Sequence, residues 1–405
     1  MASVAEIRRE LNALNAADTE YAIRFVDTLL AAAQEAAASD VHLQPVSGGL
    51  GVRWRLDGVL QELGVFPAGE SANVVARLKV LAELLTYRTD VPQEGRIREQ
   101  RGDTEMRVST FPTLHGERAV VRLFAAQQHF RHVADLGFPA ELAAAVCELL
   151  RETSGALIIS GPAGSGKTTT AYACLRELVR GAAGGKSIVA LEDPIEVAVD
   201  GVAQAQVNEH AGFDLTVGLR SLMRQDPEAI FVGEIRDRGV AETVFQAALT
   251  GHLVLTTFHA GSAAGAISRL VDMEIEPYLL RSGILAILNQ RLVRRLCSCA
   301  RPVTGEDGRL GLPVRAAYQA TGCDKCRQTG YLQRLVLAEM LTADRSELGR
   351  AILSRAEASQ LEELAIRNGM VPAWRRALEA VEGAQTSPSE VRRVFGFARM
   401  PSGSV

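Results

Sequence analysis

The sequence has few aromatic residues and no long uninterrupted apolar segment. Aromatic residues make up 5% of the chain, which argues against a surface that binds nucleic acid by stacking bases. No apolar run reaches the roughly 18 residues that a membrane-spanning helix needs. The first residues include Glu6 and Glu10 and lack an apolar segment, so they do not form a secretory signal. These absences predict a chain that works in the cytosol or is held at a membrane by its partners.

The sequence also lacks an excess of charge of one sign. Its 44 Lys and Arg residues face 48 Asp and Glu residues, for a net charge of −4. Nucleic-acid binders are usually basic overall, so we expect no nucleic-acid partner. The apolar share of 47% and the charged share of 23% are ordinary for a globular protein. The length of 405 residues predicts two or three domains.

Cysteine is too scarce for a disulfide scaffold, but four of the six cysteines lie close together in the sequence. Cys147 and Cys174 are isolated. The other four are Cys297, Cys299, Cys323 and Cys326. Paired cysteines in a cytosolic chain indicate a metal site first.

Apolar periodicity divides the chain into two folded parts. Residues 1–18 are expected to be a leader, and residues 19–125 a small α+β domain. In that domain we expect helices over 19–39 and 71–85, strands over 41–43, 52–56, 105–111 and 118–124, and a turn at Asp57-Gly58.

The periodicity is lost over residues 126–135, which we interpret as a hinge. An α/β pattern follows over 136–343 and contains an insert at 297–330 that is rich in Gly, Pro and Cys. Residues 344–405 are expected to be mostly helical, with Gly369, Gly383 and Pro388 as helix breakers.

A phosphate-binding loop lies between an apolar strand over 156–160 and a helix over 169–179. It matches G-x-x-x-x-G-K-[ST] in the strand–loop–helix context that this motif requires. The backbone N–H groups of such a loop face phosphates at the positive end of a helix. The motif therefore predicts a nucleoside triphosphate site with Lys167 on the β- and γ-phosphates and Thr168 on Mg²⁺. The expected nucleotide-binding residues are Gly161, Pro162, Ala163, Gly164, Ser165, Gly166, Lys167, Thr168 and Thr169.

Acidic residues follow two further apolar strands. Glu192 and Asp193 come after residues 188–191, and Glu234 comes after residues 229–232. Ligands of open α/β sheets bind at the carboxyl ends of the strands, so these acids are candidates for the nucleotide site. We predict Glu234 as the general base that polarises water, with Glu192 also in the catalytic set. The alternatives are a solvated turn capped by Asp193 and an incidental acid at position 234.

Two histidines flank the expected strand over 253–257. His252 precedes it and His259 follows it. A single histidine is more often structural than catalytic, but two on one strand of this sheet favour a role in sensing the γ-phosphate or a neighbouring subunit. Both therefore join the candidate nucleotide-site residues.

These segments resemble the secretion ATPase superfamily, and within it the type II secretion ATPases and type IV pilus assembly ATPases. The resemblance extends over about residues 20–400. The strings that match the superfamily's Walker A, aspartate, Walker B and histidine boxes are S-G-P-A-G-S-G-K-T-T-T from Ser160, L-E-D-P-I-E from Leu191, R-Q-D-P-E-A-I-F-V-G-E-I-R-D from Arg224 and A-A-L-T-G-H-L-V-L-T-T-F-H from Ala247. Further matches are N-Q-R-L-V-R-R-L-C from Asn289, A-S-D-V-H-L-Q-P from Ala38, V-R-W-R-L-D-G-V-L from Val52 and R-V-S-T-F-P-T-L-H-G-E-R-A-V-V-R-L from Arg107.

The resemblance implies an α/β RecA-like P-loop domain preceded by a small PAS-like α+β domain. It implies a homohexamer that hydrolyses ATP to drive pseudopilus or pilus assembly, on the cytoplasmic side of the inner membrane and bound to platform proteins there. Arg107 and Arg122 match arginines that reach the nucleotide, and Arg118 is a weaker candidate. From the residues alone, each of these arginines also fits a solvated strand face.

The sequence departs from the family pattern in two places. Assembly ATPases usually carry a further N-terminal domain that docks on a membrane partner, whereas only residues 1–18 precede the first domain here. The family's metal insert usually reads C-x-x-C twice, but its first half here is the shorter Cys297-Ser298-Cys299. Four thiolates could still enclose a structural Zn²⁺. The alternative is a degenerate site.

Three other functions compete with an assembly motor. A pilus retraction motor typically lacks the cysteine insert and reads A-A-E-T-G-H where this chain has A-A-L-T-G-H. A conjugation-type, DNA-linked ATPase is disfavoured by the acidic balance and the few aromatic residues. A nucleotide-sensing scaffold without turnover is disfavoured by intact Lys167, Thr168, Glu192 and Glu234.

Overall fold

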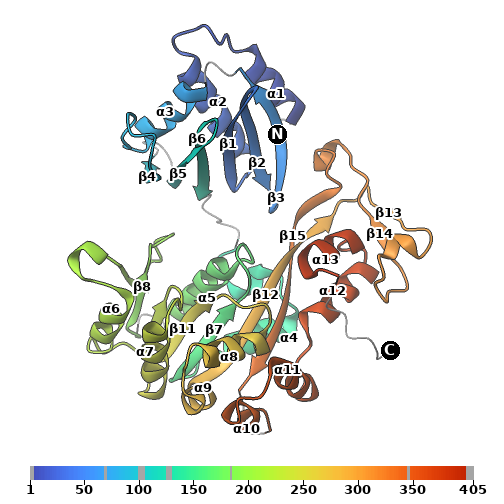
Figure 1. Ribbon diagram of the computed structural model, residues 1–405. Helices are drawn as coiled ribbons and strands as arrows, with labels where there is room; N and C mark the ends of the chain where they lie inside the picture. Colours follow the sequence, from blue (N-terminus) through green and yellow to red (C-terminus); the bar gives the residue numbers. More distant parts are fainter. Residues whose placement is uncertain are drawn as a thin grey trace. The chain divides into compact units, whose positions relative to one another are not determined.

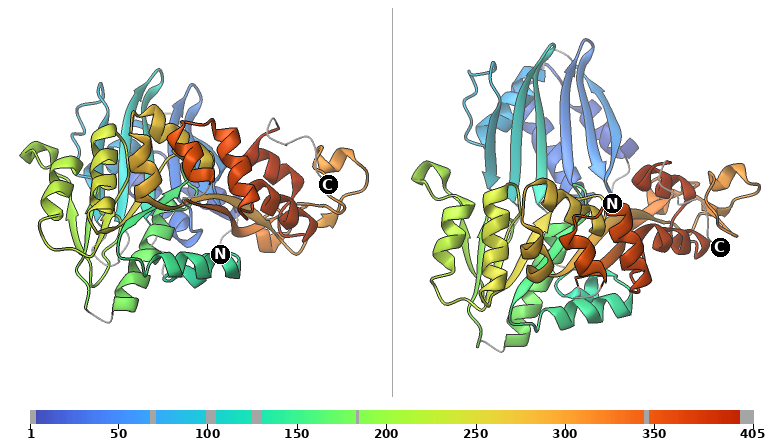
Figure 2. Two further views of the ribbon diagram at one scale, coloured as in Figure 1. Left: turned by 90° about the horizontal axis from the view of Figure 1, so that it is seen from below. Right: turned by 60° about the horizontal axis from the view of Figure 1, so that its bottom comes forward.

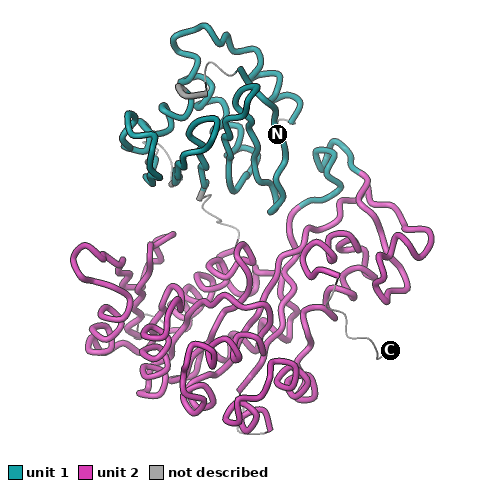
Figure 3. Tube along the Cα trace, in the orientation of Figure 1, with its two compact units in different colours: residues 1–127, 322–332 teal, residues 128–321, 333–405 magenta. Residues whose placement is uncertain are grey.

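The structure is a computed structural model and describes residues 4–67, 71–98, 105–124, 130–182, 185–343 and 347–397. It divides into two compact units (Figure 3). Unit 1 comprises Met1–Gln127 and Gly322–Leu332, and unit 2 comprises Gln128–Thr321 and Gln333–Val405. The expected hinge at 126–135 coincides with this boundary in the sequence, but residues 126–129 lie outside the described ranges.

Unit 1 contains a six-stranded antiparallel sheet with the order β3-β2-β1-β6-β5-β4 (Figure 1). Its elements are α1 (Val4–Ala13), α2 (Tyr21–Glu35), β1 (Asp40–Val46), β2 (Gly49–Leu56), β3 (Val59–Phe66), α3 (Ser71–Leu81), β4 (Gln93–Arg98), β5 (Glu105–Thr113) and β6 (Gly116–Phe124). The helices bury their apolar residues against one face, where Phe25 and Trp54 are fully buried. The opposite face carries the polar residues of the alternating strands.

The Asp57-Gly58 turn is confirmed. Both residues have positive φ, 47° and 81°, and Leu56 pairs with Val59 across the hairpin. Two positive φ values in a two-residue loop give the turn that matches the twist of the flanking strands, which is why Asp-Gly is favoured there.

The structure differs from the sequence expectation at residues 1–18. Within this segment α1 buries Ile7 and Leu11 in the same core as Phe25. The two apolar residues are four positions apart, so they lie on one face of the helix. The expected leader therefore contains a helix that belongs to unit 1.

Unit 2 contains a seven-stranded sheet with the order β15-β12-β7-β11-β10-β8-β9. Strands β12, β7, β11, β10, β8 and β9 are parallel neighbours. The strands are β7 (Gly155–Ser160), β8 (Ile188–Glu192), β9 (Ala203–Gln206), β10 (Ala229–Val232), β11 (Leu253–Phe258), β12 (Ile284–Leu296) and β15 (Tyr331–Thr342), and the short pair β13 (Arg301–Pro302) and β14 (Tyr318–Gln319) lies in the insert. The helices are α4 (Ala140–Leu149), α5 (Lys167–Ala182), α6 (Leu215–Leu222), α7 (Arg238–Leu249), α8 (Ala263–Asp272), α9 (Pro277–Gly283), α10 (Glu347–Leu353), α11 (Ala358–Arg367), α12 (Ala373–Glu382) and α13 (Pro388–Phe395).

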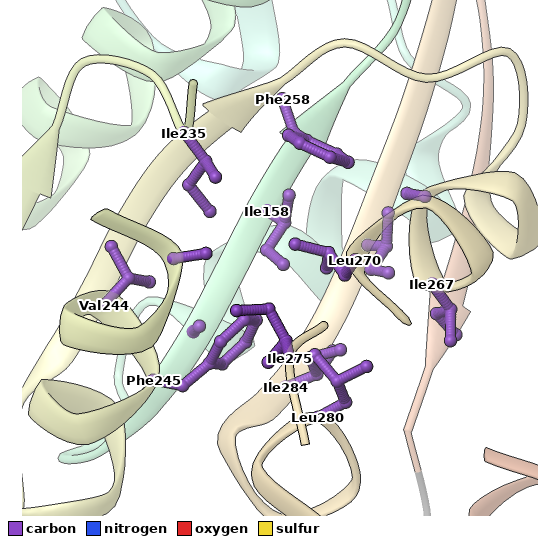
Figure 4. Close-up of a cluster of buried hydrophobic side chains, with 14 of the residues drawn as sticks. Ile158, Ile235, Val244, Phe245, Phe258, Ile267, Leu270, Ile275, Leu280 and Ile284 are labelled. Carbon is purple, nitrogen blue, oxygen red and sulfur yellow. The ribbon is translucent and has the colours of Figure 1, made fainter. Parts of the chain in front are cut away.

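Helices cover both faces of this sheet. Strand β7 alternates between two cores, because Leu157 and Ile159 pack with α4 and α5, whereas Ala156 and Ile158 pack with the helices of the other face. Figure 2 shows α4 and α8 on opposite sides of the sheet. Figure 4 shows the second core, where Ile158 lies among side chains that include Phe245 and Leu270. Burial on both faces explains why the central strands are continuous apolar runs.

The helices α10 to α13 of the expected helical region pack against the rest of unit 2. Helices α10 and α11 join the core that contains Ile158, and α12 and α13 pack with the insert residues Leu312 and Val314. Gly369 and Gly383 follow helix ends, as expected. Pro388, expected to be a breaker, is the first residue of α13, where its missing N–H costs no hydrogen bond.

Among the described residues, no helix combines the length and the apolar character that crossing a bilayer requires.

Candidate functional site

The phosphate loop lies between the end of β7 and the start of α5. Lys167 is the first residue of α5 and is 8% exposed. Its Nζ donates hydrogen bonds to the carbonyl oxygens of Gly161 and Pro162, both at 3.1 Å. Burial lowers the pKa of Lys167, whereas the charge of Glu234 raises it. The loop thus presents a buried ammonium group at the positive end of a helix, which suits phosphate.

At two positions of the loop the backbone conformation favours glycine. Gly161 has φ +151°, and a Cβ there would lie 2.4 Å from the Gln290 carbonyl oxygen. Gly166 has φ +88°. The loop also holds the buried Ser165 hydroxyl group, which has no hydrogen-bond partner among the described residues. An unpartnered donor beside a buried lysine fits a bound phosphate group.

The remaining predicted loop residues are arranged around this lysine. Pro162, Ala163 and Gly164 are exposed at the tip of the loop, and Thr168 and Thr169 are half-buried in the first turn of α5. Thr168 directly follows Lys167, the position from which a hydroxyl group can hold Mg²⁺ in loops of this kind.

Strand β12 supports the loop through two buried polar residues to which the sequence analysis assigned no role. Gln290 donates from Nε2 to the Ser165 carbonyl at 2.7 Å and accepts from the Thr170 hydroxyl at 2.9 Å. Asn289 donates to the Ser160 hydroxyl at 2.9 Å. The available signal was a pair of amides directly after the apolar run over 284–288, because a buried amide needs partners.

His259 joins the lysine to Glu234. Its Nδ1 lies 3.3 Å from Lys167 Nζ, and its Nε2 lies 3.2 Å from Glu234 Oε1. Since the ammonium group can only donate, we assign the proton of a neutral His259 to Nε2, which then donates to Glu234. The three residues follow β7, β11 and β10, which are neighbours in the sheet. The structure therefore brings together three of the predicted residues.

Glu192 is not part of this group. It is 3% exposed, its Oε2 accepts from the Tyr172 hydroxyl at 2.6 Å, and its Oε1 accepts from Gln204 Nε2 at 2.8 Å. Burial raises the pKa of Glu192, and the two hydrogen bonds lower it. The structure therefore joins Glu192 to α5 and β9 through its two oxygens.

Asp193 contacts the site through an arginine. Arg236 Nη1 donates to Asp193 Oδ2 at 2.6 Å, and Arg236 Nε lies 3.9 Å from Glu234 Oε2. The guanidinium group therefore joins the acids that follow β8 and β10.

His252 lies at the other end of β11 from His259. Its Nδ1 is 3.0 Å from the Ala247 carbonyl oxygen, so it caps the end of α7. The six residues of β11 separate the two histidines by about 20 Å. The structure therefore does not bring His252 to the phosphate loop of its own chain, contrary to the sequence expectation.

The predicted arginines lie on the polar face of the unit 1 sheet. Arg107 pairs with Arg122 across β5 and β6, and Arg122 pairs with Asp40 on β1. Arg122 is 65% exposed and donates to Asp40 Oδ1 at 3.1 Å, while Arg55 Nε lies 3.4 Å from Oδ2. Residues directly opposite each other on neighbouring strands share a face, so these side chains form one row.

Arg118 makes a different contact on the same face. Its Nη2 lies 3.2 Å from His42 Nδ1, and both side chains line a small pocket. Burial lowers the pKa of His42, the charge of Asp40 raises it, and the charge of Arg118 lowers it. Because a guanidinium group can only donate, His42 Nδ1 accepts this hydrogen bond, and Arg118 is less exposed to a ligand than Arg122.

The four clustered cysteines come together. The Sγ atoms of Cys297, Cys299, Cys323 and Cys326 all lie within 4.8 Å of one another. The Cys323 and Cys326 sulfurs are 3.6 Å apart, close to the roughly 3.8 Å between thiolates at 2.3 Å from one tetrahedral Zn²⁺. Backbone N–H groups of Cys323 and Gly330 donate to the Cys326 sulfur. The donor set fits zinc, and the short Cys297-Ser298-Cys299 spacing does not prevent it.

Comparison with solved structures supports the fold. The structure of the ATPase DotB of Legionella pneumophila is similar with a TM-score of 0.67 and 20% identity, covering 94% of this chain and 97% of that one. The pilus retraction motor PilT is similar with a TM-score of 0.54 and 22% identity, covering 90% and 98%. These likenesses confirm the expected P-loop fold.

Comparison of sequences shows the family. The profile described as "Type II/IV secretion system protein" matches residues 15–393. Type II secretion system protein E of Aeromonas hydrophila is 38% identical over 400 residues, which cover 96% of this chain and 78% of that protein. The type IV pilus assembly ATPase TfpB of Acinetobacter baylyi is 38% identical over 395 residues, covering 93% and 66%. The chain with the Lys167–His259–Glu234 group therefore belongs to the type II/IV secretion system protein family, and its similar relatives include proteins named as ATPases.

Proposed function

We propose that this chain is the motor that hydrolyses ATP to drive the assembly of a pseudopilus or a type IV pilus. The observation that carries the proposal is the contact of Lys167 with His259 and of His259 with Glu234 at the carboxyl edge of the sheet. This contact supports the proposal because it joins a buried cation that suits phosphate to an acid that suits the role of base. The names of the similar proteins, type II secretion protein E and type IV pilus assembly ATPase, supply the process.

In this proposal the residues divide the work of phosphoryl transfer. The loop N–H groups and Lys167 bind the phosphates, and Thr168 would hold Mg²⁺, which supplies positive charge to the phosphate oxygens. Glu234 accepts the proton of the attacking water. Neutral His259 donates from Nε2 to Glu234, which keeps that carboxylate oriented and next to Lys167. Glu234 is then the base, and Glu192 has a supporting role.

The assembly and partners are also part of the proposal. We propose a homohexamer in which Arg107 and Arg122 approach a bound nucleotide, because a fixed guanidinium group stabilises charge on the transferred phosphoryl group. The motor acts at the cytoplasmic face of the inner membrane through platform proteins of the secretion or pilus machine. The acidic net charge of −4 is consistent with protein partners and with no nucleic-acid partner.

Mg²⁺-dependent release of phosphate from ATP tests this function. Lys167→Ala should abolish nucleotide binding or turnover, because the phosphate charge loses its buried cation. Lys186→Ala removes an exposed lysine of the same unit and should leave turnover unchanged. Phosphate release and the binding of a fluorescent ATP analogue are measured for both variants. ATP hydrolysis by Lys167→Ala at the wild-type rate would contradict the proposal.

We further propose that the cysteine cluster binds one structural Zn²⁺, since a metal held by residues 297–299 and 323–326 joins the two ends of the insert. Elemental analysis of purified protein should find about one zinc per chain. Cys323→Ser should lose most of it, and Cys147→Ser, which changes a cysteine outside the cluster, should retain it. Protease resistance of residues 297–330 can be compared between the protein as purified and the same protein after metal removal. Equal resistance would support the alternative of a degenerate site.

A further inference from the structure

The hydroxyl group of Tyr172 is the centre of a buried hydrogen-bond network beside the phosphate loop. Tyr172 lies on α5 and is 4% exposed. The hydroxyl donates to Glu192 Oε2 at 2.6 Å. It also accepts from the backbone N–H groups of Glu196 at 3.0 Å and Val197 at 3.3 Å. One donor and two acceptor sites are all that a phenol offers, so the network uses the whole capacity of the group.

Gln204 on β9 holds the same segment from the other side. Its Nε2 donates to Glu192 Oε1 at 2.8 Å and to the Val197 carbonyl at 3.0 Å. Its Oε1 accepts from Val199 N–H at 2.7 Å. Two side chains, Tyr172 on α5 and Gln204 on β9, therefore hold loop 193–199 by hydrogen bonds. The Glu192 carboxylate accepts a hydrogen bond from each of them.

Besides the contact through His259, the network gives a second chain of contacts between Lys167 and Glu234. Helix α5 begins with Lys167 and carries Tyr172. The loop that Tyr172 holds begins with Asp193, whose carboxylate binds Arg236. Arg236 in turn lies 3.9 Å from Glu234. A shift of this loop away from α5 would therefore change the charge next to Glu234.

We propose that Tyr172 is a positioning residue for ATP hydrolysis: its hydroxyl group fixes Glu192 and loop 193–197 to the helix that carries Lys167. The proposal rests on the function proposed above. It also gives a reason for the burial of Glu192, because this carboxylate accepts hydrogen bonds from both side chains that hold the loop. In this proposal Tyr172 acts through Glu192 and the adjoining loop, and from there through Asp193 and Arg236, without touching the nucleotide.

Tyr172→Phe tests the proposal, because it removes one oxygen atom and keeps the ring. The affinity for a fluorescent ATP analogue should change by less than about threefold, whereas kcat should fall about 10- to 100-fold, the usual cost of a small misplacement of catalytic groups. Amide hydrogen exchange of Glu196 and Val197 should become faster. Tyr278→Phe is the matched control, since Tyr278 is 58% exposed, and it should change none of these quantities.

A double-mutant cycle identifies the route. If Tyr172 acts through Glu192, then the variant with both Tyr172→Phe and Glu192→Gln should turn over no more slowly than the slower single variant. Multiplying effects on kcat would overturn that route. Faster exchange in Tyr172→Phe with wild-type turnover would show that the loop does not position the site, and unchanged exchange would show that the hydroxyl does not hold the loop. Hydrogen exchange can be measured whether or not the protein hydrolyses ATP. A wild-type protein without ATP hydrolysis would therefore refute the motor function and leave the hold of Tyr172 on the loop to be tested by exchange.

Discussion

Glu234→Gln should bind ATP as tightly as the wild-type protein and hydrolyse it at least about 100-fold more slowly. The substitution keeps the size of the side chain, so the phosphate loop and its lysine are unchanged. An amide cannot accept the proton of the attacking water. In addition, the carboxylate oxygen that lies 3.2 Å from His259 Nε2 loses its charge, which weakens the link to the histidine. Binding of a fluorescent ATP analogue and single-turnover phosphate release measure the two effects separately.

The matched control for this experiment is Glu209→Gln. Glu209 lies in an exposed short helix at 209–211, away from the strand that precedes Glu234. It should hydrolyse ATP at the wild-type rate. Wild-type turnover by Glu234→Gln would mean that another group accepts the proton, and Glu192→Gln would then be the next variant to measure. A loss of binding would mean that Glu234 holds the nucleotide instead.

Arg122→Ala should reduce turnover by about 10³-fold or more, the range that an arginine contributes when it stabilises charge on the transferred phosphoryl group. ATP binding should remain largely intact, because the phosphate loop lies in unit 2. The folded state should lose little, since the ion pair with Asp40 involves a guanidinium group that is 65% exposed. Arg107→Ala should act in the same direction, and Arg9→Ala, on an exposed position of α1, should not.

Mixing inactive chains shows whether the arginine acts across subunits. In a hexamer assembled from Arg122→Ala and Lys167→Ala chains, some interfaces combine an intact arginine with an intact lysine. Activity should partly return at those interfaces, and specific activity of the wild-type protein should rise with its concentration as rings assemble. If mixed hexamers form but regain no ATP hydrolysis, the arginine acts in the site of its own chain or has no role in the reaction.

The parts of the site that local sequence determines could be predicted. The glycines of residues 161–168 identify the phosphate loop, and the position of Glu234 after a short apolar strand identifies it as a site residue. The reason is physical: buried parallel strands are apolar runs, and their carboxyl ends meet at one edge. The same reasoning identified His259, which lies at that edge next to Lys167.

The parts that depend on distant pairing could not be predicted. His252 and His259 have the same context in the sequence, beside one apolar strand, but they lie at opposite ends of β11. Gln290 and Tyr172 escaped notice because their partners are 125 and 20 residues away, at Ser165 and Glu192. The helix over Val4–Ala13 was missed because two buried apolar residues in a short segment give too weak a period to recognise.

The order of strands in unit 2 has a consequence for the synthesis of the chain. Strand β7, which leads into the phosphate loop, pairs only with β11 and β12 in the part of the chain that the structure describes. Both partners begin after residue 252. During synthesis the phosphate loop therefore leaves the ribosome well before either strand that pairs with β7. Asn289 and Gln290, whose amides support the loop, are made later still. The contacts that support the phosphate loop are therefore complete only when most of unit 2 has been made.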